Sequence, residues 1–192
     1  MKKIIAAIVL IYPLISFSQQ LPVFHVKANK LEAITAERKI KMGTALQLFE
    51  KVMNDTAFQN QLLSTSFYFD VTGDPNKLLT KKEIAEKIYN GKEFYKDSAN
   101  HTADINWIIV KQNKPLLSLH PAIGYGDAGD VEIFTYSWYF DKEEVNEIAG
   151  HIAHEWLDKA GFQHQFRKHK KRKLTVPYAF GKMVSEYARK YM

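Results

Sequence analysis

Cysteine is absent from the 192 residues of the chain. That absence excludes disulfide scaffolds, thiolate zinc sites, iron–sulfur clusters and a cysteine nucleophile. A bound metal could then be held only by histidine and carboxylate side chains. Internal repeats and low-complexity tracts are lacking too, and 46% hydrophobic with 25% charged residues is ordinary for a globular protein. These values exclude wholesale disorder, a collagen-like chain and a multi-pass membrane protein.

Only the amino terminus carries a long apolar run, and that run has the features of a secretory signal peptide. Lys2 and Lys3 precede apolar residues 4–15, and Ser16-Phe17-Ser18 places small residues where a signal peptidase reads them. The run is about a dozen residues long, whereas a membrane span needs roughly 20. We therefore predict a signal peptide over residues 1–18; a retained membrane anchor is the weaker alternative.

Removal of this leader leaves residues 19–192, which is 192 − 18 = 174 residues, a length typical of one domain. The formal charge falls from +6 to 6 − 2 = +4 because Lys2 and Lys3 are removed. No cysteine follows the leader, so a lipid-anchored lipoprotein is excluded. We expect an exported monomer, periplasmic or secreted, with no membrane span after the leader is removed.

The pattern of apolar residues in the mature chain predicts a mixture of helices and strands. Helices are predicted over residues 42–53 and from Thr80 to Gly91, where Thr80 and Glu83 form a capping box. Strands are predicted over residues 23–26, 67–69, 105–110 and 133–140, the last with alternating aromatic residues. The glycine-rich segment 124–130 lacks the lysine of a phosphate-binding loop, so we interpret it as a turn between strands.

One further helix, predicted over Glu143 to Ala160, ends at Gly161. At about 100° per residue its side chains divide into two arcs. The apolar arc contains Ala149, Ile152, Ala153, Trp156, Leu157 and Ala160. The polar arc contains Glu147, His151, His154, Glu155 and Asp158. Taken alone, these arcs describe an ordinary amphipathic helix with a solvated face.

The polar arc also suits a metal site. His154 and Asp158 stand at positions i and i+4, so their side chains project in the same direction from adjacent turns. Glu155 lies a fraction of a turn to the side, where it can reach water on a bound ion. Gly161 lets the chain turn back, and His164 can then close the site as a third ligand.

The string HEWLDKAGFQH, from His154 to His164, resembles the metzincin zinc-binding motif HExxHxxGxxH at its first histidine, glutamate, glycine and last histidine. It also resembles a group of small exported bacterial proteins in which a Val-Pro-Tyr segment follows, here Val176-Pro177-Tyr178. The resemblance covers this segment well and the rest of the chain loosely. It implies an α+β, zincin-like single domain over residues 19–192. A mixed twisted sheet would be backed by the helix from about Met42 and by the metal-binding active-site helix.

Under this resemblance, zinc is the cofactor, held by His154, Asp158 and His164, and Glu155 is the catalytic general base. Asp158 departs from the family, which has a histidine at that position. Aspartate binds zinc through oxygen, but its charge makes the metal a weaker Lewis acid. Lower activity, a different metal or an inactive site are therefore all consistent with the sequence.

Each of three further residues has two possible roles. Tyr178 is a candidate for approaching the metal or a developing oxyanion, and equally a packing aromatic after Pro177. Met183 is a candidate for the methionine turn of the family, and equally a core residue of the last helix. His151, one turn before His154, is a candidate for supporting the metal ligands, and equally a solvated group.

The first functional hypothesis is an exported zinc metalloendopeptidase that acts on a peptide or protein substrate. Zinc would lower the pKa of bound water, and Glu155 would take the proton and pass it to the leaving amine. The strand over residues 133–140 would be a sheet edge that binds the substrate backbone by strand addition.

Two alternatives remain open. One is a catalytically inactive metzincin-like binding protein with a degraded metal site and a basic docking loop, and the other is an accidental motif on an amphipathic helix. The docking loop would be the basic run from Arg167 to Lys173, which suits a solvated loop or contact with an anionic surface. No nucleic-acid-binding motif accompanies it, so we expect no specific nucleic-acid partner.

Overall fold

The structure, a computed structural model, describes residues 21–93, 99–114, 122–126, 131–164 and 170–192. The predicted signal peptide over residues 1–18 lies outside these ranges. Within them, no helix combines the length and the apolar character that crossing a membrane requires.

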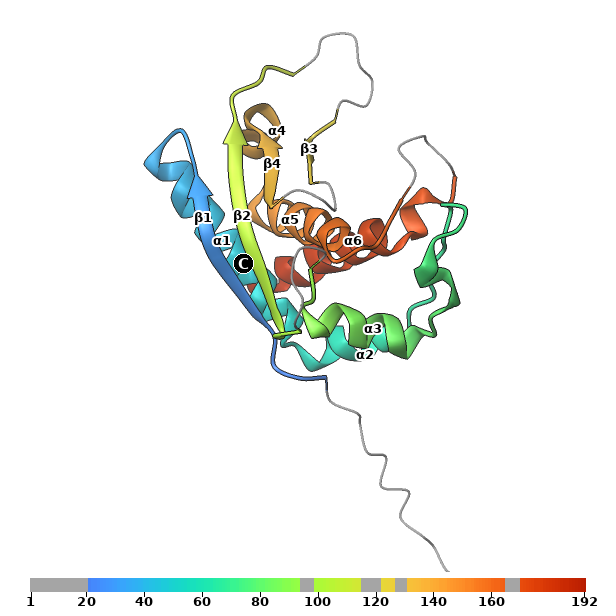
Figure 1. The fold of residues 1–192 in the computed structure, drawn as a ribbon. Coiled ribbons are helices and arrows are strands. Elements are labelled where there is room, and N and C mark those ends of the chain that lie inside the picture. Colours follow the sequence, from blue (N-terminus) through green and yellow to red (C-terminus); the bar gives the residue numbers. More distant parts are fainter. Residues whose placement is uncertain (1–20, 94–98, 115–121, 127–130, 165–169) are drawn as a thin grey trace, which may run out of the picture.

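The described residues form a mixture of helices and strands (Figure 1). The strands are β1 (His25–Glu32), β2 (Thr102–Val110), β3 (Gly124–Tyr125) and β4 (Glu132–Tyr136). The α-helices are α1 (Ala36–Met53), α2 (Thr56–Ser64), α3 (Lys81–Asn90), α4 (Ser137–Lys142), α5 (Val145–Lys159) and α6 (Val176–Ala188). Short 3₁₀ helices are η1 (Pro75–Leu78), η2 (Arg172–Leu174) and η3 (Arg189–Tyr191).

The strands make one four-stranded sheet in the order β1-β2-β4-β3. Strand β2 pairs in parallel with both β1 and β4, whereas β3 pairs antiparallel with β4. The sheet is therefore mixed, and its combination with the helices is compatible with the predicted α+β class. Strand β4 brings Thr135 opposite Ile109 in this register.

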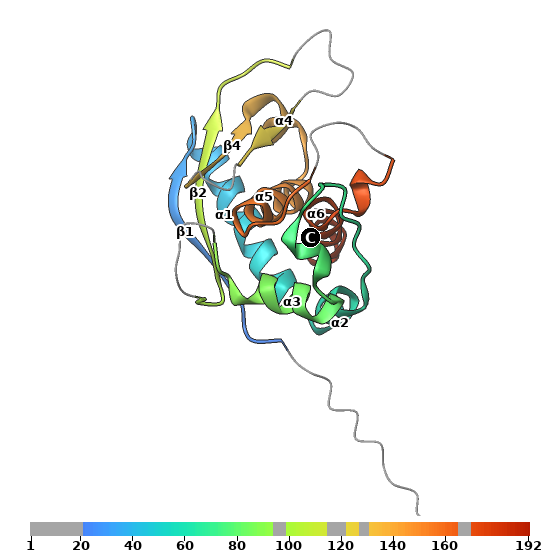
Figure 2. The same cartoon turned by 45° about the vertical axis from the view of Figure 1, so that its right-hand side comes forward.

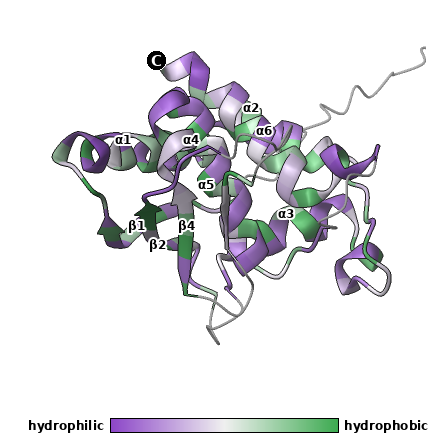
Figure 3. Cartoon of the chain, turned by 90° about the horizontal axis from the view of Figure 1, so that it is seen from above, coloured by the Kyte–Doolittle hydropathy of each residue, from purple (hydrophilic) through white to green (hydrophobic). Residues whose placement is uncertain are grey.

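The helices lie against one face of the sheet (Figures 2 and 3). Helix α5 contacts β4 and also packs against α1 and α6. Along β2, side chains alternate between this covered face and the outer face, because successive residues of a strand point to opposite sides. Ile105, Trp107 and Ile109 are buried toward the helices, while Asn106 and Ile108 are only half-buried. Helix α5 therefore packs on this covered face of the sheet.

Two helix predictions are confirmed with their physical causes. Helix α3 begins at the Thr80–Glu83 capping box and ends at Gly91, whose φ of 65° is left-handed. Helix α5 buries the whole predicted apolar arc. Helix α1 begins earlier than residue 42, because the Thr35 hydroxyl accepts a hydrogen bond from the Arg38 amide and caps an additional turn.

The prediction of a strand over residues 133–140 is wrong in its second half and in its position. Strand β4 ends at Tyr136, and residues 137–142 form α4, which turns the Phe140 ring onto Trp107 at a centroid distance of 5.7 Å. The aromatic alternation continues past Tyr136, so it conceals this change of structure. Strand β4 also lies between β2 and β3, and is therefore not the sheet edge that the sequence suggested.

Smaller differences concern the first two predicted strands. The strand expected at residues 23–26 begins at His25 and runs on to Glu32. Residues 67–69 form no strand; the Tyr68 amide donates one hydrogen bond, of 2.9 Å, to the Leu174 carbonyl. This single hydrogen bond connects residues 67–69 to the end of η2, but it does not make them part of a sheet.

Candidate metal centre

The end of α5 sets the direction of the chain that leaves it. The Phe162 amide donates to the Leu157 carbonyl at 3.0 Å, and the Gly161 amide donates to the Asp158 carbonyl at 3.1 Å. This pair of bonds is a Schellman motif, and it requires the left-handed φ of 81° at Gly161. The chain therefore reverses after the helix and runs back along it.

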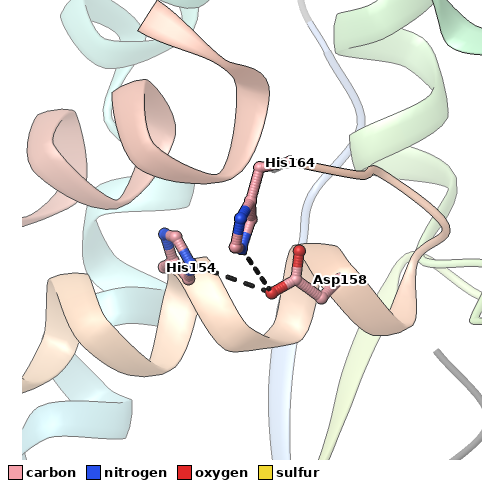
Figure 4. Close-up of side chains that lie close together, drawn as sticks. All are labelled: His154, Asp158 and His164. Atoms are coloured by element: carbon pink, nitrogen blue, oxygen red, sulfur yellow. Dashed lines mark ion pairs between the residues drawn. The ribbon is translucent and has the colours of Figure 1, made fainter. Parts of the chain in front are cut away.

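The reversal brings His164 over the two candidate ligands of α5 (Figure 4). Asp158 Oδ2 lies 3.8 Å from His154 Nε2 and 3.4 Å from His164 Nε2. One ligand atom from each of the three residues lies within 4.8 Å of the others. The structure thus brings together the three side chains that the sequence pattern singled out.

These distances and donor types fit a zinc ion. Ligands at roughly 2.0–2.2 Å from tetrahedral zinc lie about 3.4 Å from one another, and both measured separations from Asp158 Oδ2 are close to that value. Two imidazole nitrogens and one carboxylate oxygen are a common zinc donor set. The side chains of His154, Asp158 and His164 are 13%, 16% and 9% exposed. The group is therefore largely sheltered, and each of the three side chains keeps some contact with solvent.

Close packing of α5 against α6 places a fourth side chain, that of Tyr178, next to this group. A Cβ atom at Gly150 would lie 2.5 Å from the Gly181 carbonyl oxygen, and one at Gly181 would lie 3.0 Å from His154 Cβ. Only glycine permits such an approach of two helix backbones. The start of α6 consequently places the Tyr178 ring 4.4 Å from the His154 ring and 4.9 Å from the His164 ring, centroid to centroid.

The surroundings of His154 favour its neutral form. Burial lowers the pKa of this histidine well below its usual value, and electrostatic interactions with the His164, His151 and Arg172 side chains act in the same direction. A hydrogen bond to the backbone of Pro177 acts in the opposite direction. Neutral imidazole is the form that binds a metal, and a ring nitrogen held by a backbone carbonyl is typical of metal-binding histidines.

Arg172 makes a contact that a metal would have to change. Its Nη2 lies 3.5 Å from His164 Nδ1. Arginine only donates hydrogen bonds, so Nδ1 accepts here and the proton of a neutral His164 ring is on Nε2, facing Asp158. A metal bound at Nε2 needs that proton to move to Nδ1, and Arg172 would then have to withdraw. Metal binding at Nε2 therefore requires a proton on Nδ1 of His164, whereas the contact with Arg172 requires Nδ1 to be unprotonated.

The two other predicted residues of the polar arc are buried instead of solvated. His151 is 5% and Glu155 is 7% exposed, with His151 Nδ1 at 3.5 Å from Glu155 Oε1. Burial lowers the pKa of His151 to about 3, so its ring is neutral near pH 7. Burial is the largest cause that raises the pKa of Tyr178; the Arg172 charge acts in the opposite direction, and the charges of Glu155 and Asp158 add to the rise.

Met183 and the basic run have positions that the sequence did not determine. Met183 lies inside α6, not in a turn, and its sulfur accepts a contact of 3.8 Å from the Thr65 hydroxyl. Residues 167–169 of the basic run lie outside the described residues. Arg172, at the other end of the run, stacks over the Tyr178 ring at 4.5 Å. No pattern in the sequence indicates that Arg172 turns inward, because it stands in a run of similarly charged residues.

Comparison with protein-family models, with curated proteins and with solved structures finds no match to this chain.

Proposed function

We propose that the chain is an exported zinc metalloendopeptidase with a zincin-like fold, in which His154, Asp158 and His164 hold the metal. The convergence of their three ligand atoms within 4.8 Å carries the proposal. The convergence depends on both the helical spacing of His154 and Asp158 and the chain reversal at Gly161. The mixed sheet and the position of α5 against it also agree with this fold.

Zinc, when bound, supplies a Lewis acid that polarises a peptide carbonyl and makes a water molecule more acidic. Glu155 accepts the proton of the attacking water and returns it to the amine of the leaving peptide. The neighbouring Tyr178 hydroxyl, with its raised pKa, keeps its proton near pH 7 and can donate a hydrogen bond to the oxygen that becomes negative. Arg172 over the Tyr178 ring adds positive charge on the same side.

Strand β3 is the strand next to the substrate in this proposal. It is the last strand in the order β1-β2-β4-β3, and a glycine within it approaches the α5 residue His151. An extended peptide could add to the outer side of β3 through backbone hydrogen bonds.

The experiment compares Glu155→Gln with Glu147→Gln on an unfolded protein substrate, with zinc per chain measured for each. Glu147 is on the same helix but forms a surface ion pair of 3.0 Å with Arg189. We expect Glu155→Gln to lower kcat by about 10²- to 10⁴-fold while zinc stays bound, and Glu147→Gln to retain activity. Equal activity of wild type and Glu155→Gln would contradict the proposal.

Two observations favour a second function, a binding protein with a degraded site. Arg172 occupies the Nδ1 side of His164, and Asp158 brings negative charge where the motif has histidine. If zinc binds with a stoichiometry of one and neither wild type nor Asp158→His hydrolyses protein, the binding protein becomes the better account.

A further inference from the structure

A buried chain of hydrogen bonds leads from β2 through β4 to α5. Trp107 Nε1 lies 2.9 Å from Thr135 Oγ1, and Thr135 Oγ1 lies 2.9 Å from His151 Nε2. On the other side of the imidazole ring, His151 Nδ1 lies 3.5 Å from Glu155 Oε1. Trp107 and Thr135 have no exposed surface. The chain therefore lies in the interior and ends at the carboxylate assigned above to proton transfer.

The chemistry of these groups favours one direction for the chain of hydrogen bonds. An indole Nε1–H only donates, so the Thr135 oxygen accepts from Trp107. The hydroxyl proton is then available for His151 Nε2, which accepts it if the ring carries its own proton on Nδ1. In the opposite tautomer, the lone pair on Nδ1 would face the negative charge of Glu155. Each step thus favours the tautomer with an Nδ1–H directed at Glu155.

We propose that His151, held in its Nδ1–H tautomer by Thr135 and Trp107, is a positioning residue that orients the Glu155 carboxylate. This proposal rests on the proposed function for the identity of the reaction, but not for the hydrogen-bond chain itself. The contact of 3.5 Å is longer than an ordinary hydrogen bond. Hydrogen bonds of catalytic groups are often long before substrate binds and tighten in the complex.

The packing around His151 is built to hold the ring in this place. A Cβ atom at Gly124 of β3 would lie 2.9 Å from the His151 ring and 2.3 Å from the Phe134 carbonyl oxygen. The Tyr139 ring meets the imidazole edge to face at a centroid distance of 5.3 Å. Strand β3 therefore passes over the ring with only the space that glycine leaves, and the ring has little freedom to rotate.

The first test reads the tautomer directly, without zinc or substrate, by ¹⁵N NMR of the labelled protein. We expect His151 Nε2 to resonate as an unprotonated nitrogen and Nδ1 as a protonated one. Thr135→Val, which removes the hydroxyl at nearly constant shape, should shift the ring toward the Nε2–H tautomer or a mixture. Thr135→Ser keeps the hydroxyl and should keep the wild-type tautomer. Glu155→Leu removes the acceptor and should move the Nδ1 proton resonance upfield.

The second test separates positioning from stability. For Thr135→Val we expect kcat to fall about tenfold, in the range found when partners of active-site ligands are removed, with KM and zinc per chain unchanged. Thr135→Ser should restore kcat, and thermal melting confirms that each variant is folded at the assay temperature. Trp107→Phe removes the indole donor together with part of the buried ring, and should lower kcat in the same way in protein that is folded at the assay temperature.

Three results overturn the proposal: an Nε2–H tautomer in wild type, an Nδ1 proton resonance that Glu155→Leu does not move, or wild-type kcat in folded Thr135→Val. If the wild-type protein hydrolyses nothing, the proposed function fails, and the tautomer with its responses to Thr135→Val and Glu155→Leu still decides whether His151 orients Glu155.

Discussion

Replacing Asp158 by alanine removes the atom shared by both short contacts of the candidate metal centre, at 3.8 Å from His154 Nε2 and 3.4 Å from His164 Nε2. Two imidazoles would remain. Loss of groups that merely support a metal ligand weakens binding about 10- to 100-fold, so loss of Asp158 itself should cost about 100-fold or more.

Zinc-dependent melting makes this loss measurable. A ligand at 100 times its Kd stabilises the folded state by about 2.7 kcal/mol, and for a chain of 192 residues each kcal/mol raises Tm by about 2–4 °C. Wild type should therefore gain about 5–11 °C at that zinc concentration. Asp158→Ala, with Kd now near the zinc concentration, should gain only about 0.4 kcal/mol, or 1–2 °C.

Two variants complete the series. Asp158→His should retain or increase the zinc-dependent gain in Tm, because a neutral imidazole is a good zinc ligand. It should also match or exceed wild-type peptidase activity, since it leaves more positive charge on the metal. Glu147→Ala removes a carboxylate from the same helix but outside the cluster, and should show the wild-type gain in Tm when zinc is added. An Asp158→Ala protein that keeps the full zinc-dependent gain would refute the assignment of Asp158 as a ligand.

Two further predictions concern the packing of α5 and the contact of Arg172. Gly150→Ala would push a Cβ atom to 2.5 Å from the Gly181 carbonyl oxygen and should lower the free energy of unfolding by about 1–3 kcal/mol in urea titrations. Gly43→Ala in α1, where nothing lies within 4 Å, should instead raise it by up to about 1 kcal/mol. Arg172→Gln should tighten zinc binding several-fold in calorimetric titrations, because His164 Nδ1 no longer faces a cation; weaker binding would contradict the tautomer argument.

Local signals in the sequence predicted the structure correctly where neighbouring residues determine it. The capping box at Thr80 and the glycine at position 91 mark the two ends of α3, because both act within one turn of the helix. The turn at Gly161 is equally local, and so the return of His164 to the face of His154 and Asp158 followed from spacing alone.

The sequence failed where the structure depends on contacts across the fold. His151 and Glu155 belong to a polar arc that resembles a solvated helix face, yet Thr135 of β4 and Gly124 of β3 lie against His151, and Gly126 lies against Glu155. No pattern within α5 contains that information. The switch from β4 to α4 after Tyr136 was hidden for the same reason, since the burial of Phe140 depends on Trp107 in a distant strand.

The central claim is that His154, Asp158 and His164 hold a metal ion, and metal content tests it most directly. Purified wild type and His154→Ala are dialysed against a small excess of zinc over chain and then against metal-free buffer, and zinc per chain is measured by mass spectrometry. We predict about one zinc per wild-type chain and almost none in His154→Ala. Zinc near zero in wild type, or the same amount in both proteins, would contradict the claim.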